Sequence, residues 1–259
     1  MKIIATTTQS NTQIKEDFVR FIEEGGFSYI PRQRKSIALL CSEQQASGVV
    51  VWQPEGPVLH IGGELFFFHP SMAKNRIACF RKFKQADTLI KASQLQPGDS
   101  FLDCTLGLGA DAIVASYFSS GGQVVGLESS RPIALIVRWG MRMYNSSMNW
   151  LNAAVNNVEV INAEHHSYLQ ALPDNSFDIV YFDPMFRKPI LESQAIAPLR
   201  LMANHQELSA EALNEACRVA RKRVVVKEMA NSREFERLGL IKLEFSPHNK
   251  ISYGIKEIC

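Results

Sequence analysis

The fold is decided by the stretch Ser100-Phe-Leu-Asp-Cys-Thr-Leu-Gly-Leu-Gly-Ala-Asp111. Residues 101–104 are predicted to form a short buried strand, residues 105–109 a glycine turn, and the residues from Ala110 onward a helix. A strand, a glycine turn and a helix in this order hold a nucleotide-like ligand at the carboxyl ends of the strands of an α/β sheet. Glycines let the backbone approach a ligand closely, and the start of the helix offers unpaired N–H groups.

Strands alternate with helices after this stretch. The candidate strands are 100–104, 123–128, 158–161, 177–182 and 222–228, and the candidate helices are 109–119, 131–146, 165–171 and 194–220. Two last strands, 241–245 and 251–258, are joined by a turn too short for a crossover helix, so we expect them to be antiparallel. This order predicts an α/β fold with a Rossmann-like, mostly parallel sheet and an antiparallel edge.

The first part of the chain has a different pattern. Residues 1–72 are predicted to form a small α+β lobe, and residues 73–259 the main domain. In the lobe we expect a helix over 13–24 and strands over 2–7, 36–41, 49–53, 57–62 and 65–68. A helical stretch is expected over 69–95, between the lobe and the glycine turn.

Composition bounds the function. The chain has 259 residues, 46% of them hydrophobic, and a net charge of +2, so any nucleic acid must be bound by a local patch. The five scattered cysteines have no CxxC spacing, which argues for a reducing compartment and against disulfides or a zinc site. The start of the chain lacks a signal-peptide hydrophobic region, and no stretch approaches the roughly 18 apolar residues of a membrane span. We therefore expect a cytoplasmic protein with neither a metal nor a membrane partner.

A local basic cluster lies between the lobe and the glycine turn. Its five cations, interleaved with Phe80 and Phe83, are Lys74, Arg76, Arg81, Lys82 and Lys84. Two interpretations stand side by side: a surface that contacts phosphate, or a solvated helix with two aromatic residues in the core.

The glycine turn alone does not identify the ligand, since residues 107–112 also satisfy the dinucleotide pattern G-x-G-x-x-A. Asp103, inside the preceding strand, would repel a pyrophosphate but suits the amino group and sulfonium of S-adenosylmethionine (SAM). Asp111 adds a second carboxylate, although its role could be only to stabilise the helix start. Glu128 ends the next strand, where an acid accepts the ribose hydroxyls of either NAD or SAM.

A second motif, Asp183-Pro-Met-Phe186, ends the strand predicted over 177–182. A methyltransferase that acts on a planar exocyclic amine needs such a turn, because Asp183 and the carbonyl of Pro184 can accept its N–H groups. Phe186 can then stack on the ring. A base inside folded RNA would have to be turned out to reach this pocket. The alternative is an ordinary junction between a strand and a turn.

With these motifs the chain resembles the class I SAM-dependent methyltransferases. More narrowly, Leu106-Gly-Leu-Gly-Ala-Asp111, Phe182-Asp-Pro-Met-Phe186 and Lys222-Arg-Val-Val-Val-Lys227 resemble the bacterial family that makes N2-methylguanosine in small-subunit ribosomal RNA. The likeness covers roughly residues 70–230, whereas the first 68 residues look more like a less characterised branch of methyltransferases. The resemblance implies SAM as cofactor and guanine N2 in ribosomal RNA as the methyl acceptor.

The motifs and the resemblance together nominate the site residues. Those expected to contact the cofactor are Asp103, Thr105, Gly107, Gly109, Ala110, Asp111, Glu128, Ser129, Glu164, His165 and Asp183. The catalytic set is Asp183, Pro184 and Phe186, and the substrate-binding set is Arg76, Arg187, Lys188 and Lys227. Lys227 is open to two roles, contact with a substrate phosphate or pairing with a nearby acid. The family has arginine where this chain has Ala110, and small hydroxyl residues where it has Glu164-His165.

Three function classes follow from this pattern. An RNA N-methyltransferase is favoured, a methyltransferase on a small molecule or protein is second, and an NAD-dependent or non-catalytic nucleotide-binding protein is third. The pattern does not indicate an oligomeric state.

Overall fold

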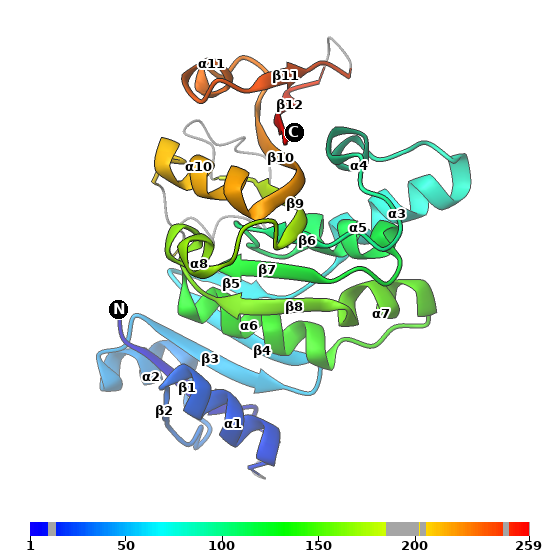
Figure 1. Ribbon diagram of the computed structural model, residues 1–259. Helices are drawn as coiled ribbons and strands as arrows, with labels where there is room; N and C mark the ends of the chain where they lie inside the picture. Colours follow the sequence, from blue (N-terminus) through cyan, green and yellow to red (C-terminus); the bar gives the residue numbers. More distant parts are fainter. Residues whose placement is uncertain (10–13, 185–201, 203–205, 246–248, 259) are drawn as a thin grey trace. The chain divides into compact units, whose positions relative to one another are not determined.

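The computed structural model describes residues 1–259 except 10–13, 185–201, 203–205, 246–248 and 259 (Figure 1). The chain divides into two compact units. The first includes Met1–His69 and Arg131–Asn145, and the second includes Pro70–Ser130, residues 146–184 and those from 206 onward. A helix from the middle of the chain therefore belongs to the first unit. The boundary between residues 72 and 73 stays a prediction.

The first unit contains a mixed sheet with the strand order β2-β1-β3-β4-β5. β1 runs parallel to β2 and β3, whereas β3, β4 and β5 follow one another as antiparallel neighbours. The strands are β1 (Ile3–Thr7), β2 (Ser28–Tyr29), β3 (Gly48–Gln53), β4 (Gly56–Ile61) and β5 (Glu64–Phe67). This is an α+β arrangement.

The helices of this unit are α1 (Glu16–Gly25), α2 (Ile37–Gln44) and α6 (Arg131–Met143). Leu40 of α2 packs with Ile4 and Val49 of the sheet. A separate aromatic cluster joins α1, β3 and α6, because the rings of Trp52 and Trp139 lie 5.5 Å apart and Phe21 lies 5.1 Å from Trp52. Both tryptophans are buried, as expected of core residues.

The strand predicted over Ser36–Cys41 is wrong, because these residues begin α2. A short apolar run does not by itself distinguish a buried strand from a helix. The Ser36 side chain decides between them here, since it accepts a hydrogen bond from the backbone N–H of Leu39 and caps the helix.

The second unit contains a seven-stranded sheet with the order β11-β12-β10-β9-β6-β7-β8. Five neighbouring strands of the sheet are parallel to one another: β10, β9, β6, β7 and β8. β12 is antiparallel to both β10 and β11. The strands are β6 (Phe101–Asp103), β7 (Val124–Glu128), β8 (Val158–Asn162), β9 (Phe177–Phe182), β10 (Ala220–Met229), β11 (Ile241–Leu243) and β12 (Ile251–Glu257). The predicted mostly parallel sheet with an antiparallel edge is confirmed.

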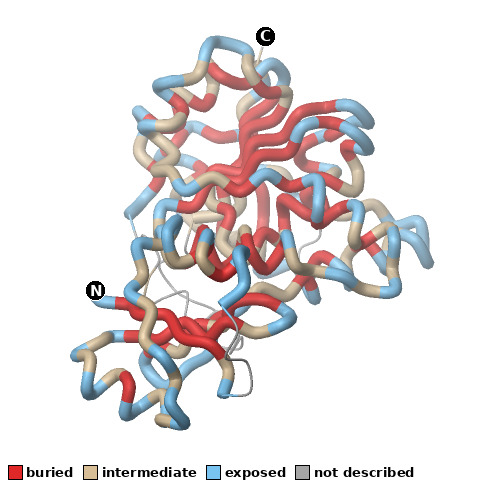
Figure 2. Tube along the Cα trace, turned by 90° about the horizontal axis from the view of Figure 1, so that it is seen from below, coloured by how far each residue is buried: buried red, intermediate tan, exposed pale blue. Residues whose placement is uncertain are grey.

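The order of this sheet locates a ligand site. From β6 the chain moves outward to β7 and β8, and then returns to β9 on the other side of β6. Ligands of open α/β sheets bind where the strand order reverses, outside the carboxyl ends of the strands. That point lies between β6 and β9, and the central strands are almost wholly buried (Figure 2).

Helices pack on both faces of this sheet. They are α3 (Ser71–Phe83), α4 (Thr88–Ser93), α5 (Ala110–Ser119), α7 (Asn149–Asn156), α8 (His165–Ala171) and α10 (Ala210–Val219), with α11 (Glu234–Arg237) between β10 and β11. The helical stretch expected over 69–95 is two helices, since Lys84 ends α3 in the left-handed conformation and Asp87 caps α4. Most of the predicted helix 194–220 before α10 lies outside the described residues.

Within the described ranges, no helix is both long and apolar enough to cross a membrane. No group of His, Cys, Asp or Glu side chains in those same ranges is arranged to hold a metal ion.

Candidate functional site

The glycine turn follows β6 at the point where the strand order reverses. Gly107 and Gly109 have φ angles of +51° and +75°, which only glycine adopts without strain. Backbone hydrogen bonds hold the turn from two neighbouring strands: the Cys104 N–H donates to the Tyr181 carbonyl, and the Leu106 N–H to the Leu127 carbonyl. α5 begins at Ala110, directly after the turn.

Gly126, in the middle of β7, leaves room for this turn to pack against the strand. A Cβ atom added at Gly126 would lie 2.3 Å from Cδ1 of Leu106, so the missing side chain leaves the space that Leu106 fills. Sequence reasoning missed this residue, because a glycine inside a strand signals a close approach without naming what approaches.

Glu128 faces the turn from the end of β7. Its carboxylate accepts hydrogen bonds from the N–H of Ser130 at 2.8 Å and from the N–H of Gly107 at 3.3 Å. Burial raises the pKa of Glu128, and these two hydrogen bonds oppose that rise. Each carboxylate oxygen keeps a free lone pair, so Glu128 can accept from a pair of hydroxyl groups. The carbonyl of the next residue, Ser129, accepts from Asn162 Nδ2 at 3.2 Å.

Thr105 joins the ends of two strands. Its N–H and its hydroxyl donate to Asp103 Oδ1 at 3.0 and 3.4 Å. The same hydroxyl oxygen accepts from the N–H of Asp183 at 2.6 Å. The end of β6 is thereby tied to the residue that follows β9.

Lys227 lies between two carboxylates. Its ammonium is 2.7 Å from Asp183 Oδ2 and 3.0 Å from Asp111 Oδ2. The hydroxyl of Tyr181 also donates to Asp111 Oδ2, at 2.9 Å. Lys227 comes from β10, Asp183 from the end of β9 and Asp111 from the first turn of α5. Of the two roles predicted for Lys227, the structure shows pairing with acids.

Arg76 extends this network into α3. Its Nε and Nη2 donate to the two oxygens of Asp87 at 2.9 and 2.8 Å, and its Nη1 donates to Asp111. The ion pairs therefore form one chain that runs Asp87–Arg76–Asp111–Lys227–Asp183. Arg76, predicted to bind substrate, here contacts carboxylates of the protein.

The network sets the charge of the site. Burial alone would raise the pKa of Asp111, but the cations Lys227 and Arg76 outweigh it and hold that pKa below its ordinary value. Burial would lower the pKa of Lys227, and the charges of Asp111 and Asp183 raise it instead. Burial raises the pKa of Asp183, with the negative charge of Asp111 adding to the effect of burial.

Asp103 adds to the negative character of this region. Burial raises its pKa well above the ordinary value, and the negative charges of Asp111 and Asp183 raise it further. The chain of ion pairs holds three carboxylates and two cations, so it has a net charge of −1 before Asp103 is counted. This surplus of negative charge favours a positively charged ligand. Such a ligand would also stabilise the ionised form of Asp103.

Glu164 and His165 lie at the start of α8, after β8. The Glu164 carboxylate caps this helix by accepting from the N–H groups of His166 and Ser167, both at 2.9 Å. The ring of His165 packs edge-on against Phe182 with 5.6 Å between ring centres, and burial lowers the pKa of His165. Contact of these two residues with a cofactor stays a prediction.

The structure thus links six predicted site residues through direct contacts: Arg76, Asp103, Thr105, Asp111, Asp183 and Lys227. A separate hydrogen bond joins Glu128 to Gly107. Pro184 follows Asp183, whereas Phe186, Arg187 and Lys188 lie outside the described residues. Asp87 and Tyr181 were missed. Tyr181 could have been found, because alternate residues of a strand share a face and Tyr181 precedes Asp183 by two positions.

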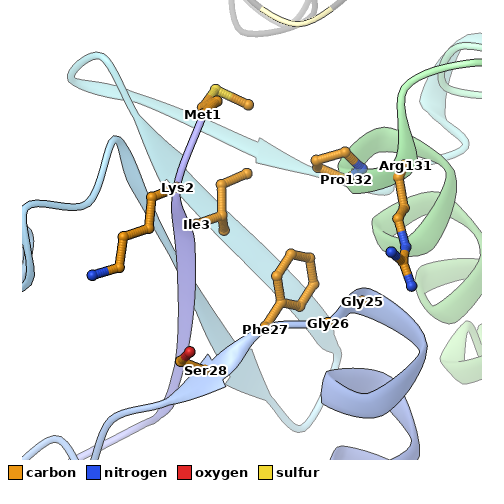
Figure 3. A pocket seen from close by; sticks show the side chains of 9 residues that line it. All are labelled: Met1, Lys2, Ile3, Gly25, Gly26, Phe27, Ser28, Arg131 and Pro132. Atoms are coloured by element: carbon orange, nitrogen blue, oxygen red, sulfur yellow. The ribbon is translucent and has the colours of Figure 1, made fainter.

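A pocket of about 340 Å³ lies in the first unit and involves none of the predicted site residues (Figure 3). Its lining comes from the start of β1, the turn after α1 and the start of α6: Met1, Lys2, Ile3, Gly25, Gly26, Phe27, Ser28, Arg131 and Pro132. Arg131 Nε donates to the carbonyl of Glu24 at 3.0 Å.

Comparison with known proteins places this geometry in a family. Residues 66–238 match the model of a family described as "Putative SAM-dependent methyltransferase". The chain is 38% identical over 218 residues to the uncharacterized protein YpiP of Bacillus subtilis, and the match covers 84% of each protein.

Two further relatives have more informative names. The chain is 32% identical to the ribosomal RNA small subunit methyltransferase J of Coxiella burnetii over 134 residues, which are 51% of this chain and 50% of that relative. The crystal structure of the SAM-dependent methyltransferase NGO1261 from Neisseria gonorrhoeae has a TM-score of 0.63 and 19% identity, covering 99% of this chain and 96% of the other. The latter likeness concerns the fold.

Proposed function

Because this chain belongs to the family of SAM-dependent methyltransferases, we propose that it methylates an exocyclic amine of a nucleobase in ribosomal RNA, with guanine N2 as the acceptor. The enzyme class and the cofactor follow from the family and from the Rossmann-like sheet. The acceptor is the proposed part. The observation that carries it is the paired Asp183, which ends β9 beside the glycine turn.

The residues around the turn fit SAM. Glu128 has the free acceptors that the two ribose hydroxyls need, and the turn exposes N–H groups at the start of α5. The net negative charge of the cluster that contains Asp111 and Asp183 suits a sulfonium and an amino group. When bound, SAM supplies a methyl group on a positively charged sulfur. We assign Asp103, Thr105, Gly107, Gly109, Ala110, Ser129, Glu164 and His165 to the same cofactor site.

Asp183 would orient the acceptor. Its carboxylate and the Pro184 carbonyl accept the N–H groups of the planar amine, which aligns the nitrogen with the methyl carbon. Transfer of the methyl group that SAM would supply also requires the amine to lose a proton. Asp183 is suited to accept this proton, because burial raises its pKa above the ordinary value of an aspartate.

Lys227 would act through Asp183. Its ammonium occupies one side of the carboxylate at 2.7 Å and so fixes the orientation of Asp183. Its charge also lowers the pKa of Asp183, against burial and the charge of Asp111, which raise that pKa. Lys227 is therefore a positioning residue in this mechanism.

An RNA acceptor is supported by the relative from Coxiella burnetii, whose name is that of a small-subunit ribosomal RNA methyltransferase. The alignment with that relative covers about half of each protein. A paired base would have to be turned out of its helix to reach Asp183.

Tritiated methyl transfer to ribosomal RNA tests the proposal. RNA from cells that lack the protein should accept label from SAM, and nucleoside mapping should find it in N2-methylguanosine. Asp183→Ala should abolish the transfer, while the circular dichroism spectrum and thermal unfolding of that variant serve as the control for folding. Label in a small molecule or a protein in place of RNA would contradict the proposed acceptor.

A further inference from the structure

We infer that the exposed residues of α3 form a binding surface for the RNA strand next to the target nucleotide. This α3 surface consists of Lys74, Arg81, Lys82, Phe83, Lys84 and the neighbouring Trp150 of α7. The inference rests on the proposed function, because it names where the RNA substrate would be held.

The charge of the surface is one-sided. Its four cations, Lys74, Arg81, Lys82 and Lys84, are exposed, and none forms an ion pair with a carboxylate of the described residues. Neither residues 70–86 nor residues 144–158 contain an aspartate or a glutamate. The whole chain has a net charge of only +2, so this is a local positive field of the kind that phosphates require.

Aromatic rings lie among these cations. The guanidinium of Arg81 is 5.2 Å from the centre of the Trp150 ring, and Lys82 Nζ is 4.9 Å from the centre of the Phe83 ring. Phe83 is 64% exposed, so its ring is accessible to a base. Cations that bind phosphates and exposed rings that stack on bases are the combination by which proteins hold unpaired nucleic acid.

α3 connects this surface directly to the site. Arg76 of α3 contacts Asp111 at the start of α5, and Arg81 donates to the hydroxyl of Tyr117 farther along α5 at 3.3 Å. The two helices therefore lie side by side. From Lys74 to Lys84 it spans roughly 15 Å. A strand bound there is held by a rigid element that also carries a site residue.

Fluorescence anisotropy with a labelled single-stranded RNA oligonucleotide tests this surface. Lys82→Ala and Lys84→Ala should each weaken binding at low salt and lower the slope of log affinity against log salt by about 0.7. Phe83→Ala should weaken binding roughly fivefold or more without changing that slope. Lys15→Ala is the matched control, because Lys15 is exposed but lies before α1.

Methyl-transfer kinetics separate this inference from the proposed function. With ribosomal RNA as acceptor, the α3 variants should raise KM and leave kcat and the affinity for S-adenosylhomocysteine unchanged. Binding of RNA by Lys82→Ala and Lys84→Ala with wild-type affinity and salt slope would overturn the surface, while methyl transfer to RNA would still stand. RNA binding that depends on these lysines, in a protein that transfers no methyl group to RNA, would support the surface and refute the proposed reaction.

Discussion

The ammonium of Lys227 lies 2.7 Å from the carboxylate of Asp183, and the two residues come from neighbouring parallel strands. The side chain of Lys227 is 15% exposed, and its ammonium also pairs with Asp111. One cation thus pairs with both carboxylates, that of Asp111 at the start of α5 and that of Asp183 after β9.

Lys227→Met should lower kcat at neutral pH and displace the acid limb of the pH profile. Without the ammonium, burial and Asp111 raise the pKa of Asp183 further, so the ionised form is reached only at higher pH. Activity should therefore recover partly as pH rises. Lys227→Arg keeps the charge and should keep most of the profile.

The same variant should lose stability, since breaking a buried ion pair costs about 3–5 kcal/mol. Thermal unfolding, recorded beside the kinetics, separates this loss from the catalytic effect. A Lys227→Met protein that is folded and has the wild-type pH profile would contradict the role given to Lys227.

Glu128→Gln should weaken binding of S-adenosylhomocysteine by roughly ten- to a hundredfold, because a hydrogen bond to a charged group contributes about 1.5–3 kcal/mol. The new amide NH₂ would also face the N–H of Gly107 or Ser130, which now donate to the carboxylate. Titration calorimetry measures the effect, with Glu159→Gln as the control, because Glu159 is exposed on the neighbouring strand β8 and belongs to no predicted site. Equal affinities of Glu128→Gln and the wild type would remove Glu128 from the cofactor site.

Cofactor affinity should depend on pH through Asp103. Its pKa is raised in the free protein by burial and by Asp111 and Asp183, so its protonated form persists to a higher pH than that of an ordinary aspartate. A bound sulfonium stabilises the ionised form, which means that SAM binding lowers this pKa and releases protons. Affinity should rise with pH up to the raised pKa of the free protein and then level off.

Calorimetry in two buffers of different ionisation enthalpy would detect the released protons. Asp103→Asn should abolish the release and flatten the pH dependence. Proton release of wild-type size in Asp103→Asn would assign the titration to another group.

Gly126→Ala should displace the glycine turn, because Leu106 of that turn packs against Gly126. The added methyl group would meet Leu106 at 2.3 Å, and overpacking of this kind costs about 1–3 kcal/mol. Stability and affinity for S-adenosylhomocysteine should both fall. Leu106→Ala in the same chain relieves the contact and should restore part of the affinity. If the double variant bound S-adenosylhomocysteine more weakly than either single variant, packing of Leu106 on Gly126 would not position the turn.

The convergence of the candidate site residues could be predicted from the sequence because the local patterns and the sheet topology agree. Asp103, Glu128 and Asp183 each follow or end a parallel strand, and such strands present their carboxyl ends at one edge of the sheet. Their convergence therefore needed only the strand assignments. The helix α2 was missed because an apolar run from Ile37 to Leu40 fits either periodicity.

The ion pairs could not be predicted in this way. Arg76 is separated from Asp111 by 35 positions, and only the packing of α3 against α5 brings them together. Nothing local distinguished Arg76 from Arg81, although one is turned into the network and the other lies over Trp150. Glu164 accepts from the N–H groups of His166 and Ser167 and so caps α8. An acidic residue directly before a helix is a local signal of such a cap, but Glu164 was predicted only to contact the cofactor.

The hydroxyl of Thr105 has a thermodynamic consequence. It accepts from the backbone of Asp183 while it belongs to the turn that we assign to the cofactor, so the two halves of the proposed site share one hydrogen bond. Binding of either ligand should then be cooperative with binding of the other, and linkage requires the coupling to be equal in both directions. Thr105→Val, which keeps the shape and removes the hydroxyl, should make the two binding events independent.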